Sequence, residues 1–364
     1  MRLNVIQRWA DRLCSSVKII GCVTALGASM AASARETLYI FTWTDYTSPE
    51  VIDAFEKQYN ARVVLNYFGT MGDMYARLQA GGDAQFDLVI PSSYYVPRLI
   101  HSGLVQPLDH SKLPNARNLL PVFAEADYDP GLKYSMPYQW GSTGLVYDTR
   151  VFPQAPESWS LLFDPKLNPD APFSMQTDGN VMIAAACAYL GYGYTCQDKK
   201  QWIDAAHLLL KTRQRSNFTG FVDGAPVLSQ VVRGVNRIGV TFSGDFVNQR
   251  NEDPEGFQHL AYALPREGSE RWVDVMMIPK RAPHPELALA FINFVMDAKQ
   301  GAALSNYIYN ASPNRASQPY LDDVLKEAPA WPTDEEQQRL HMLPGLDGVQ
   351  LQTFQQIWSE VRSR

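Results

Sequence analysis

The stretch T-L-Y-I-F-T-W-T-D-Y-T-S-P-E at positions 37–50 contains a strand followed by a helix start, and it decides the fold class. Residues 38–43 are apolar and β-prone. Ser48, Pro49 and Glu50 then have the order of an N-cap, a first-turn proline and a first-turn acid. The stretch therefore predicts a buried strand that leads directly into a helix.

The same alternation continues along the chain. Residues 62–68 predict a strand, residues 72–79 a helix, and F-D-L-V-I-P at 86–91 a strand apolar enough to be buried on both faces. Three such units in a row predict an α/β fold with a parallel, doubly wound sheet, in which ligands lie beyond the carboxyl ends of the strands. Further strands are expected at 144–147, 238–242 and 272–279, and further helices at 181–190, 199–213, 225–233 and 285–296.

The first 34 residues have the pattern of an export signal. Four basic residues precede or flank a short apolar run at 19–30, and Ala32, Ser33 and Ala34 supply a small-residue cleavage site. The apolar run is shorter than the roughly 20 residues of a membrane-spanning helix. We expect cleavage after Ala34 and a location in the periplasm, and an uncleaved anchoring segment is the alternative interpretation.

Beyond residues 1–34 the chain carries 28 basic and 37 acidic residues. This balance argues against nucleic acid and anionic membrane as partners, and it permits a cationic ligand. About 330 residues exceed one typical core, so two lobes are expected. Cys187 and Cys196 are the cysteines that remain. In an oxidising compartment they could pair, and two buried free thiols are the alternative.

Polar and aromatic side chains follow two of the predicted strands. An indole, a hydroxyl, a carboxylate and a phenol come after the first strand, at Trp43, Thr44, Asp45 and Tyr46, and S-S-Y-Y at 92–95 follows the third. Aromatic faces attract an ammonium group by about 0.5–2 kcal/mol each, and a carboxylate neutralises it. The pattern predicts a site for a small organic cation. Core packing by the rings and helix capping by Asp45 is the alternative interpretation.

Five motifs, in order and spread over the chain beyond residue 34, carry a family resemblance. They are T-L-Y-I-F-T-W-T-D-Y at 37–46, F-D-L-V-I-P-S-S-Y-Y-V at 86–96, Q-P-L-D-H-S-K-L-P at 106–114, M-P-Y-Q-W-G-S-T-G at 136–144 and W-V-D-V-M-M-I-P at 272–279. The sequence resembles the periplasmic polyamine-binding proteins of ABC importers, typified by the spermidine/putrescine and putrescine binders. The resemblance implies a two-lobed periplasmic binding protein fold (type II), each lobe a mixed, mostly parallel sheet flanked by helices.

The resemblance also implies an organisation and a mode of action. The N-terminal lobe would comprise 35–143 plus 273–319, and the C-terminal lobe 144–272 plus 320–364. A cleft between them would close around a polyamine by hinge motion, without chemistry, cofactor or metal, and an inner-membrane ABC permease would receive it. We expect a monomer.

Carried over position by position, the resemblance implies a set of ligand-binding residues. Asp245 matches a carboxylate for one amine, Asp274 matches a carboxylate on the inter-lobe crossover, and Trp272 matches an aromatic wall. With Asp45, these acids would converge on one cation. The full set is Trp43, Thr44, Asp45, Tyr46, Ser92, Tyr94, Asp178, Phe242, Asp245, Trp272, Asp274 and Tyr309.

Three positions depart from the family pattern. Three residues after Asp178 the family has a second acid, whereas this chain has Val181, with Asn180 as the nearest polar group. Phe242 stands where the family has a tryptophan, and Asn310 stands where it has a tyrosine, with Tyr309 beside it. These changes favour a shorter diamine, a modified amine, or a molecule with one cationic end.

Other functions remain as alternatives. Another amine-bearing solute, such as an ω-amino acid or a guanidinium compound, is supported by Val181. Tyr94 and Tyr95 resemble the paired tyrosines of ferric-binding proteins, but none of the six histidines falls in a ligand-spaced pair. Beyond residue 34 the patterns G-x-S-x-G, H-E-x-x-H and S-x-x-K are missing, so we expect no enzyme.

Overall fold

The opening motif forms the strand and helix that its sequence predicts. β1 (Glu36–Thr42) leads into α1 (Pro49–Tyr59), and the Val51 amide donates a hydrogen bond to the hydroxyl of the N-cap Ser48 at 3.4 Å. This computed structural model describes residues 35–155 and 157–363. The predicted export signal and its cleavage after Ala34 lie outside the described residues.

β1 is the centre of a parallel group of strands. It pairs in parallel with β2 (Ala61–Tyr67) on one side and with β3 (Leu88–Val89) on the other. The parallel arrangement predicted for the start of the chain is therefore confirmed. β3 is shorter than the six residues expected at 86–91. On either side of it, the Asp87 amide donates a hydrogen bond to the Tyr39 carbonyl of β1, and the Ile90 amide donates one to the Phe41 carbonyl.

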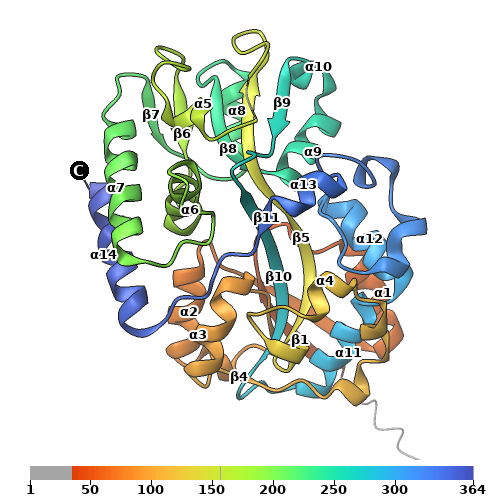
Figure 1. Ribbon diagram of the computed structural model, residues 1–364. Coiled ribbons are helices and arrows are strands. Elements are labelled where there is room, and N and C mark those ends of the chain that lie inside the picture. Colours follow the sequence, from red (N-terminus) through yellow and green to blue (C-terminus); the bar gives the residue numbers. More distant parts are fainter. Residues whose placement is uncertain (1–34, 156, 364) are drawn as a thin grey trace, which may run out of the picture. The chain divides into compact units, whose positions relative to one another are not determined.

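Two long strands cross the molecule from one half to the other (Figure 1). β5 (Ser135–Asp148) and β10 (Ser269–Pro279) pair antiparallel with each other. β10 also pairs antiparallel with β3, and β5 pairs antiparallel with β8 (Ile238–Phe242). The two strands thus join two lobes, each a mixed sheet flanked by helices, as expected from the sequence.

Within the described residues the strands follow the order β2-β1-β3-β10-β5-β8-β6-β7, and β4, β9 and β11 pair with β10 or β5. The other strands are β4 (Val105–Gln106), β6 (Phe173–Met175), β7 (Phe218–Phe221), β9 (Leu260–Ala263) and β11 (Leu340–His341). The other helices are α2 (Met71–Gln79), α3 (Val96–His101), α4 (Pro121–Ala124), α5 (Ser160–Phe163), α6 (Gly179–Tyr189), α7 (Lys199–Arg213), α8 (Ala225–Val232), α9 (Ser243–Glu252), α10 (Pro254–Phe257), α11 (Pro285–Val295), α12 (Ala298–Ile308), α13 (Asp334–Gln338) and α14 (Gly348–Ser363).

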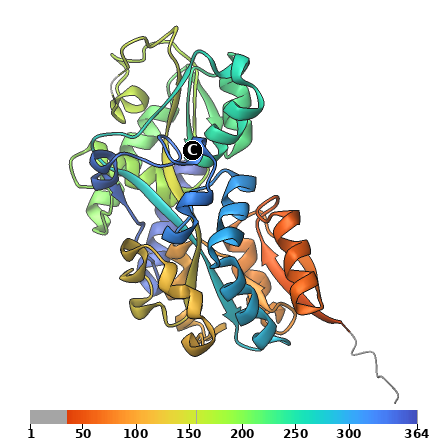
Figure 2. The ribbon, with the colours of Figure 1, turned by 90° about the vertical axis from the view of Figure 1, so that its right-hand side faces the viewer.

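The two lobes have separate hydrophobic cores. In the lobe of β1, Phe55 of α1 packs edge-on against Phe291 and Phe294 of α11. Figure 2 shows α1, α11 and α12 side by side there. The second core gathers around α6 and α7, where Trp202 packs against Phe354 of α14. Two of the predicted lobe boundaries, after residues 143 and 272, fall inside the crossing strands β5 and β10, and the third, after residue 319, falls in the short helical turn Arg315–Tyr320. The exact boundaries stay a prediction.

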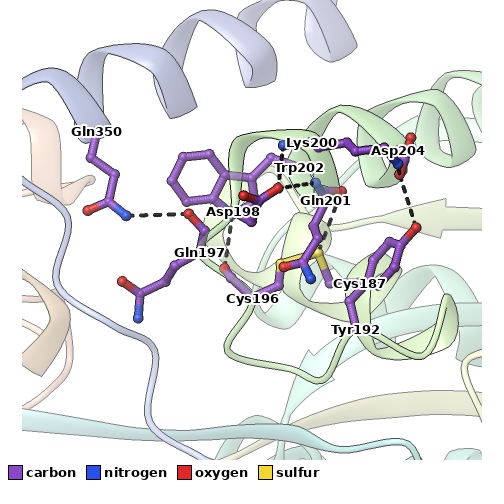
Figure 3. Close-up of a disulfide and its surroundings, with 10 residues drawn as sticks. All are labelled: Cys187, Tyr192, Cys196, Gln197, Asp198, Lys200, Gln201, Trp202, Asp204 and Gln350. Carbon is purple, nitrogen blue, oxygen red and sulfur yellow. Dashed lines mark hydrogen bonds and ion pairs between the residues drawn. A yellow bond between two sulfur atoms is a disulfide. The ribbon is translucent and has the colours of Figure 1, made fainter.

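A disulfide ties the end of α6 to the segment before α7 (Figure 3). Cys187 and Cys196 are bonded, with Cα atoms 6.3 Å apart. The Trp202 indole donates a hydrogen bond to the Cys196 carbonyl at 2.9 Å, which packs the loop against α7. Of the two alternatives left open by the sequence, pairing is therefore the one that the structure has.

No single helix in residues 35–155 and 157–363 has the length and apolar character to cross a membrane. α11 and α12 together have the required length and apolar character, but the two helices are bent by 81° relative to each other.

Candidate ligand-binding site

Three side chains on one face of β10 form the centre of the candidate site. Glu270, Trp272 and Asp274 alternate along the strand, so they share a face. On β5, Gly141 lies opposite Trp272 and Gln139 lies opposite Asp274. A Cβ at Gly141 would lie 2.3 Å from the Trp272 ring. Glycine at this position therefore leaves room for the indole on this face.

Asp274 is buried and brings together two other residues expected at the site. The Ser92 hydroxyl donates a hydrogen bond to Asp274 Oδ1 at 2.5 Å. Burial raises the pKa of Asp274 to about 6, although the Ser92 hydrogen bond acts in the opposite direction. Burial, followed by the charge of Asp274, raises the pKa of the Tyr46 hydroxyl well above its ordinary value. Tyr46, Ser92 and Asp274 are thus neighbours.

Glu270 is a further buried carboxyl at this site, and it was not among the residues expected from the sequence. It is 3 % exposed, and it accepts a hydrogen bond from the Thr143 hydroxyl. Burial raises the pKa of Glu270 to about 8, and the charges of Asp178 and Asp274 add to the rise. The signal was available in the sequence, because Glu270 precedes Trp272 and Asp274 at the same two-residue spacing.

Asp178 and Tyr94 meet on the other side of this group. Asp178 caps α6 by accepting a hydrogen bond from the Asn180 amide at 2.8 Å, and its second oxygen accepts one from the Tyr94 hydroxyl at 3.0 Å. Burial, and then the charges of Asp178 and Glu270, raise the pKa of Tyr94 well above its ordinary value. Val181 is 2 % exposed and belongs to the core around α6.

Asp245 and Phe242 lie at the start of α9. Asp245 is in the first turn, and burial raises its pKa to about 6. Its carboxylate faces the loop before α8, because a Cβ on Gly224 would lie 3.7 Å from its Oδ2. The Phe242 and Trp272 rings are T-shaped, with centroids 6.1 Å apart. The Phe242 ring therefore adjoins the β10 face, and Asp245 lies three residues after it, in the first turn of α9.

The carboxyls of this site have no basic partner. In residues 35–155 and 157–363, the ion pairs do not include Asp178, Asp245, Glu270 or Asp274. In the same part of the chain, the buried indole N–H groups of Trp43 and Trp272 have no hydrogen-bond partner. Buried acids of like charge are costly unless a cation neutralises them. The arrangement can hold a cation that also has an apolar part.

Two expected site residues are not buried with this group. Thr44 and Asp45 are exposed, and Asp45 has left-handed backbone with φ 54°. The acids that accompany Asp274 are instead Glu270 and Asp178.

The Tyr309 side chain also points elsewhere. Its hydroxyl accepts a hydrogen bond from the Asn251 amide group at 2.7 Å, and its ring packs with Val247 and Leu325. Asn310 is the residue that lies beside the start of α9, because a Cβ at Gly244 would overlap its Oδ1. This geometry favours Asn310 over Tyr309 as a site residue.

The structure adds nothing in favour of iron. No group of three or more His, Cys, Asp or Glu in the described residues could hold a metal ion. Tyr94 already donates to Asp178, and the guanidinium of Arg98 lies 5.4 Å from the Tyr95 ring centroid. A cation so close to Tyr95 would repel a metal ion.

Comparisons with known proteins find relatives over most of the length of the chain. The chain is 30% identical to the putrescine/agmatine-binding protein of Pseudomonas aeruginosa, covering 86% of this chain and 88% of that protein. It is also 30% identical to the spermidine/putrescine-binding periplasmic protein of Escherichia coli, covering 91% and 92%.

The fold agrees as well. The spermidine/putrescine ABC transporter substrate-binding protein PotD of Streptococcus pneumoniae superimposes with a TM-score of 0.77 at 26% identity, covering 90% of this chain and all of the other. The family model described as "Bacterial extracellular solute-binding protein" matches residues 50–333. The chain therefore belongs to the bacterial extracellular solute-binding protein family.

Proposed function

We propose that this chain is the periplasmic substrate-binding protein of an ABC importer and that it binds a polyamine between its two lobes. The observation that carries this proposal is the group of acids on and beside β10. Asp245, Glu270 and Asp274 lie among aromatic rings, have raised pKa values and form no ion pair within the described residues. Relatives with 30% identity are named for polyamines, which supports the same ligand class.

The ligand would use both properties of the site. Asp274 receives one ammonium group, with the Ser92 and Tyr46 hydroxyls beside it. The methylene chain lies against Trp272 and Phe242, whose rings also attract the charged ends. Trp43, Tyr94, Asp178 and Asp245 complete the contacts.

Closure of the lobes by a hinge in β5 and β10 would bury the ligand. The closed form would then deliver the ligand to an inner-membrane ABC permease. The protein acts by binding, as its family does, and we propose that it works as a monomer in the periplasm after cleavage behind Ala34.

A smaller or singly charged amine is the second candidate. The buried Val181 stands where the family has an acid. Phe242 attracts a cation less strongly than a tryptophan would. A guanidinium compound or an ω-amino acid would need fewer carboxylates than spermidine.

Calorimetric titration of the refolded, ligand-free protein tests the proposal. The panel contains putrescine, cadaverine, spermidine, agmatine, γ-aminobutyrate and ferric citrate. We expect one diamine or polyamine to saturate a single site. The same amine should bind at least about tenfold more weakly to Asp274→Asn. Binding of ferric citrate alone, or of no amine, would contradict the proposal.

A further inference from the structure

Glu270 is a buried acid that the fold itself does not explain. Burying a carboxyl costs free energy unless a partner offsets it, and Glu270 has the Thr143 hydroxyl as its hydrogen-bond partner. The family resemblance assigns it no role. The same resemblance assigns an acid to the position of Val181, which here is part of the core around α6.

The surroundings of Glu270 are acidic and aromatic. Asp178 and Asp274 are its charged neighbours. The charge of Glu270 also contributes to the raised pKa values of three nearby hydroxyl groups, those of Tyr94, Tyr194 and Tyr262. His341 lies beside it on β11, and burial, followed by the charge of Arg271, lowers the pKa of that imidazole and disfavours its charged form. Arg271 follows it in sequence but lies on the opposite face, over the Trp140 ring. No cation of the described chain therefore neutralises it.

The geometry of β10 suits a ligand with two charged ends. Glu270 and Asp274 are about 13 Å apart along the strand, at about 3.3 Å per residue. Trp272 lies between them on the same face. Both acidic side chains can lean toward the indole, so the strand presents a carboxyl, an aromatic ring and a second carboxyl in line.

We propose that Glu270 is the second ammonium anchor of this protein and takes the place of the acid that the family has at the position of Val181. The ligand then lies along β10, with one ammonium group at Asp274, its methylenes across Trp272, and the other ammonium group at Glu270 and Asp178. This assignment rests on the proposed function and names its substrate class as a diamine.

The anchor has also moved from a helix of one lobe to a strand that joins both lobes. A diamine that bridges Glu270 and Asp274 therefore contacts the crossing strand at both of its ends. A monoamine can satisfy one carboxyl only. Selection for two charged ends thus depends on Glu270.

The test compares putrescine with butylamine, which has the same number of carbons and one amine. Glu270→Gln keeps the shape of the side chain and its contact with Thr143 but removes the charge. We expect putrescine to bind about tenfold or more weakly to this variant, and butylamine to change by less than about threefold. Asp274→Asn is the control, and it should weaken both ligands.

The outcomes separate the two proposals. If Asp274→Asn weakens putrescine and Glu270→Gln does not, Glu270 is no anchor, and the proposed function stands. If the unmodified protein binds no amine, the proposed function fails first.

Glu270→Asp provides a second variant that retains the charge. Its carboxyl is withdrawn by one methylene, so the ratio of cadaverine to putrescine affinity should rise by about threefold or more. An unchanged ratio would contradict the anchor role. Thermal unfolding without ligand checks that each variant is folded.

Discussion

The buried carboxyls on the two crossing strands have opposite environments. Asp148, at the end of β5, has a fully buried side chain and accepts hydrogen bonds from Arg150 at 2.8 Å and Arg237 at 2.6 Å. Hydrogen bonds from Arg150 lead the effects that lower its pKa to about 2. Glu270 and Asp274, on β10, are nearly as buried, and their pKa values rise to about 8 and about 6.

The environments differ in whether the chain itself supplies a cationic partner for the carboxylate. The chain provides Asp148 with two guanidinium groups, so this carboxylate stabilises the fold. Within residues 35–155 and 157–363 it provides Glu270 and Asp274 with hydroxyl groups alone, so their ionised forms need a cation from outside. The charges around each carboxyl thus distinguish an acid that stabilises the fold from the acids that we propose bind the ligand.

The largest expected effect is the loss of the structural pair. Asp148→Asn should lower the free energy of unfolding by about 2 kcal/mol at pH 7, because two arginines lose their buried partner. The pKa of Asp148 is depressed, so this stabilisation is present above the ordinary pKa of an aspartate and disappears as the pH falls toward 2. Urea denaturation at pH 7 and pH 3 measures it. If Asp148→Asn binds the ligand more weakly but is as stable as the unmodified protein, Asp148 does not have the structural role assigned to it.

Asp274→Asn should show the reverse pattern. Its affinity for the diamine should fall by about tenfold or more. The ligand-free variant should be as stable as the unmodified protein at pH 8, or more stable. The pKa of Asp274 is raised, so the unmodified protein loses stability as the pH rises through about 6, and the variant avoids that loss. Calorimetry and thermal unfolding at pH 8 test both points, and a large loss of stability would place Asp274 with Asp148.

The smallest effect concerns the aromatic wall. Phe242→Trp should tighten binding of the diamine by about twofold to threefold, because an indole attracts an ammonium group more strongly than a phenyl ring. Tyr307→Phe, at an exposed position of α12, serves as an aromatic control with unchanged affinity. Weaker binding to Phe242→Trp would mean that the larger ring fills the space of the ligand.

Much of the fold could be predicted from the sequence because its signals are local. Ser48, Pro49 and Glu50 mark the start of α1. The motif around Ser92 follows β3, and the fold brings Ser92 beside Asp274 in β10. The pairing of Asp148 with Arg237 joins residues 89 positions apart, so no local sequence pattern predicts it.

The missed site residues have specific physical reasons. The strand was expected to begin at Trp272, but pairing with β11 extends β10 back to Ser269 and brings Glu270 into the site. Tyr309 adopts the left-handed backbone that ends α12, and this turn directs its ring away and leaves Asn310 beside α9. Both effects depend on tertiary contacts.

Proton release on binding tests the central claim most directly. At pH 6 the acids of the candidate site are partly protonated, because the pKa values of Asp245 and Asp274 are about 6 and that of Glu270 is about 8. A bound diamine favours the ionised forms and should release about one proton or more, and its affinity should fall as the pH is lowered from 8 to 5. Calorimetric titration of putrescine in two buffers of different ionisation enthalpy counts these protons. Binding with no proton release, at an affinity independent of pH, would contradict the account.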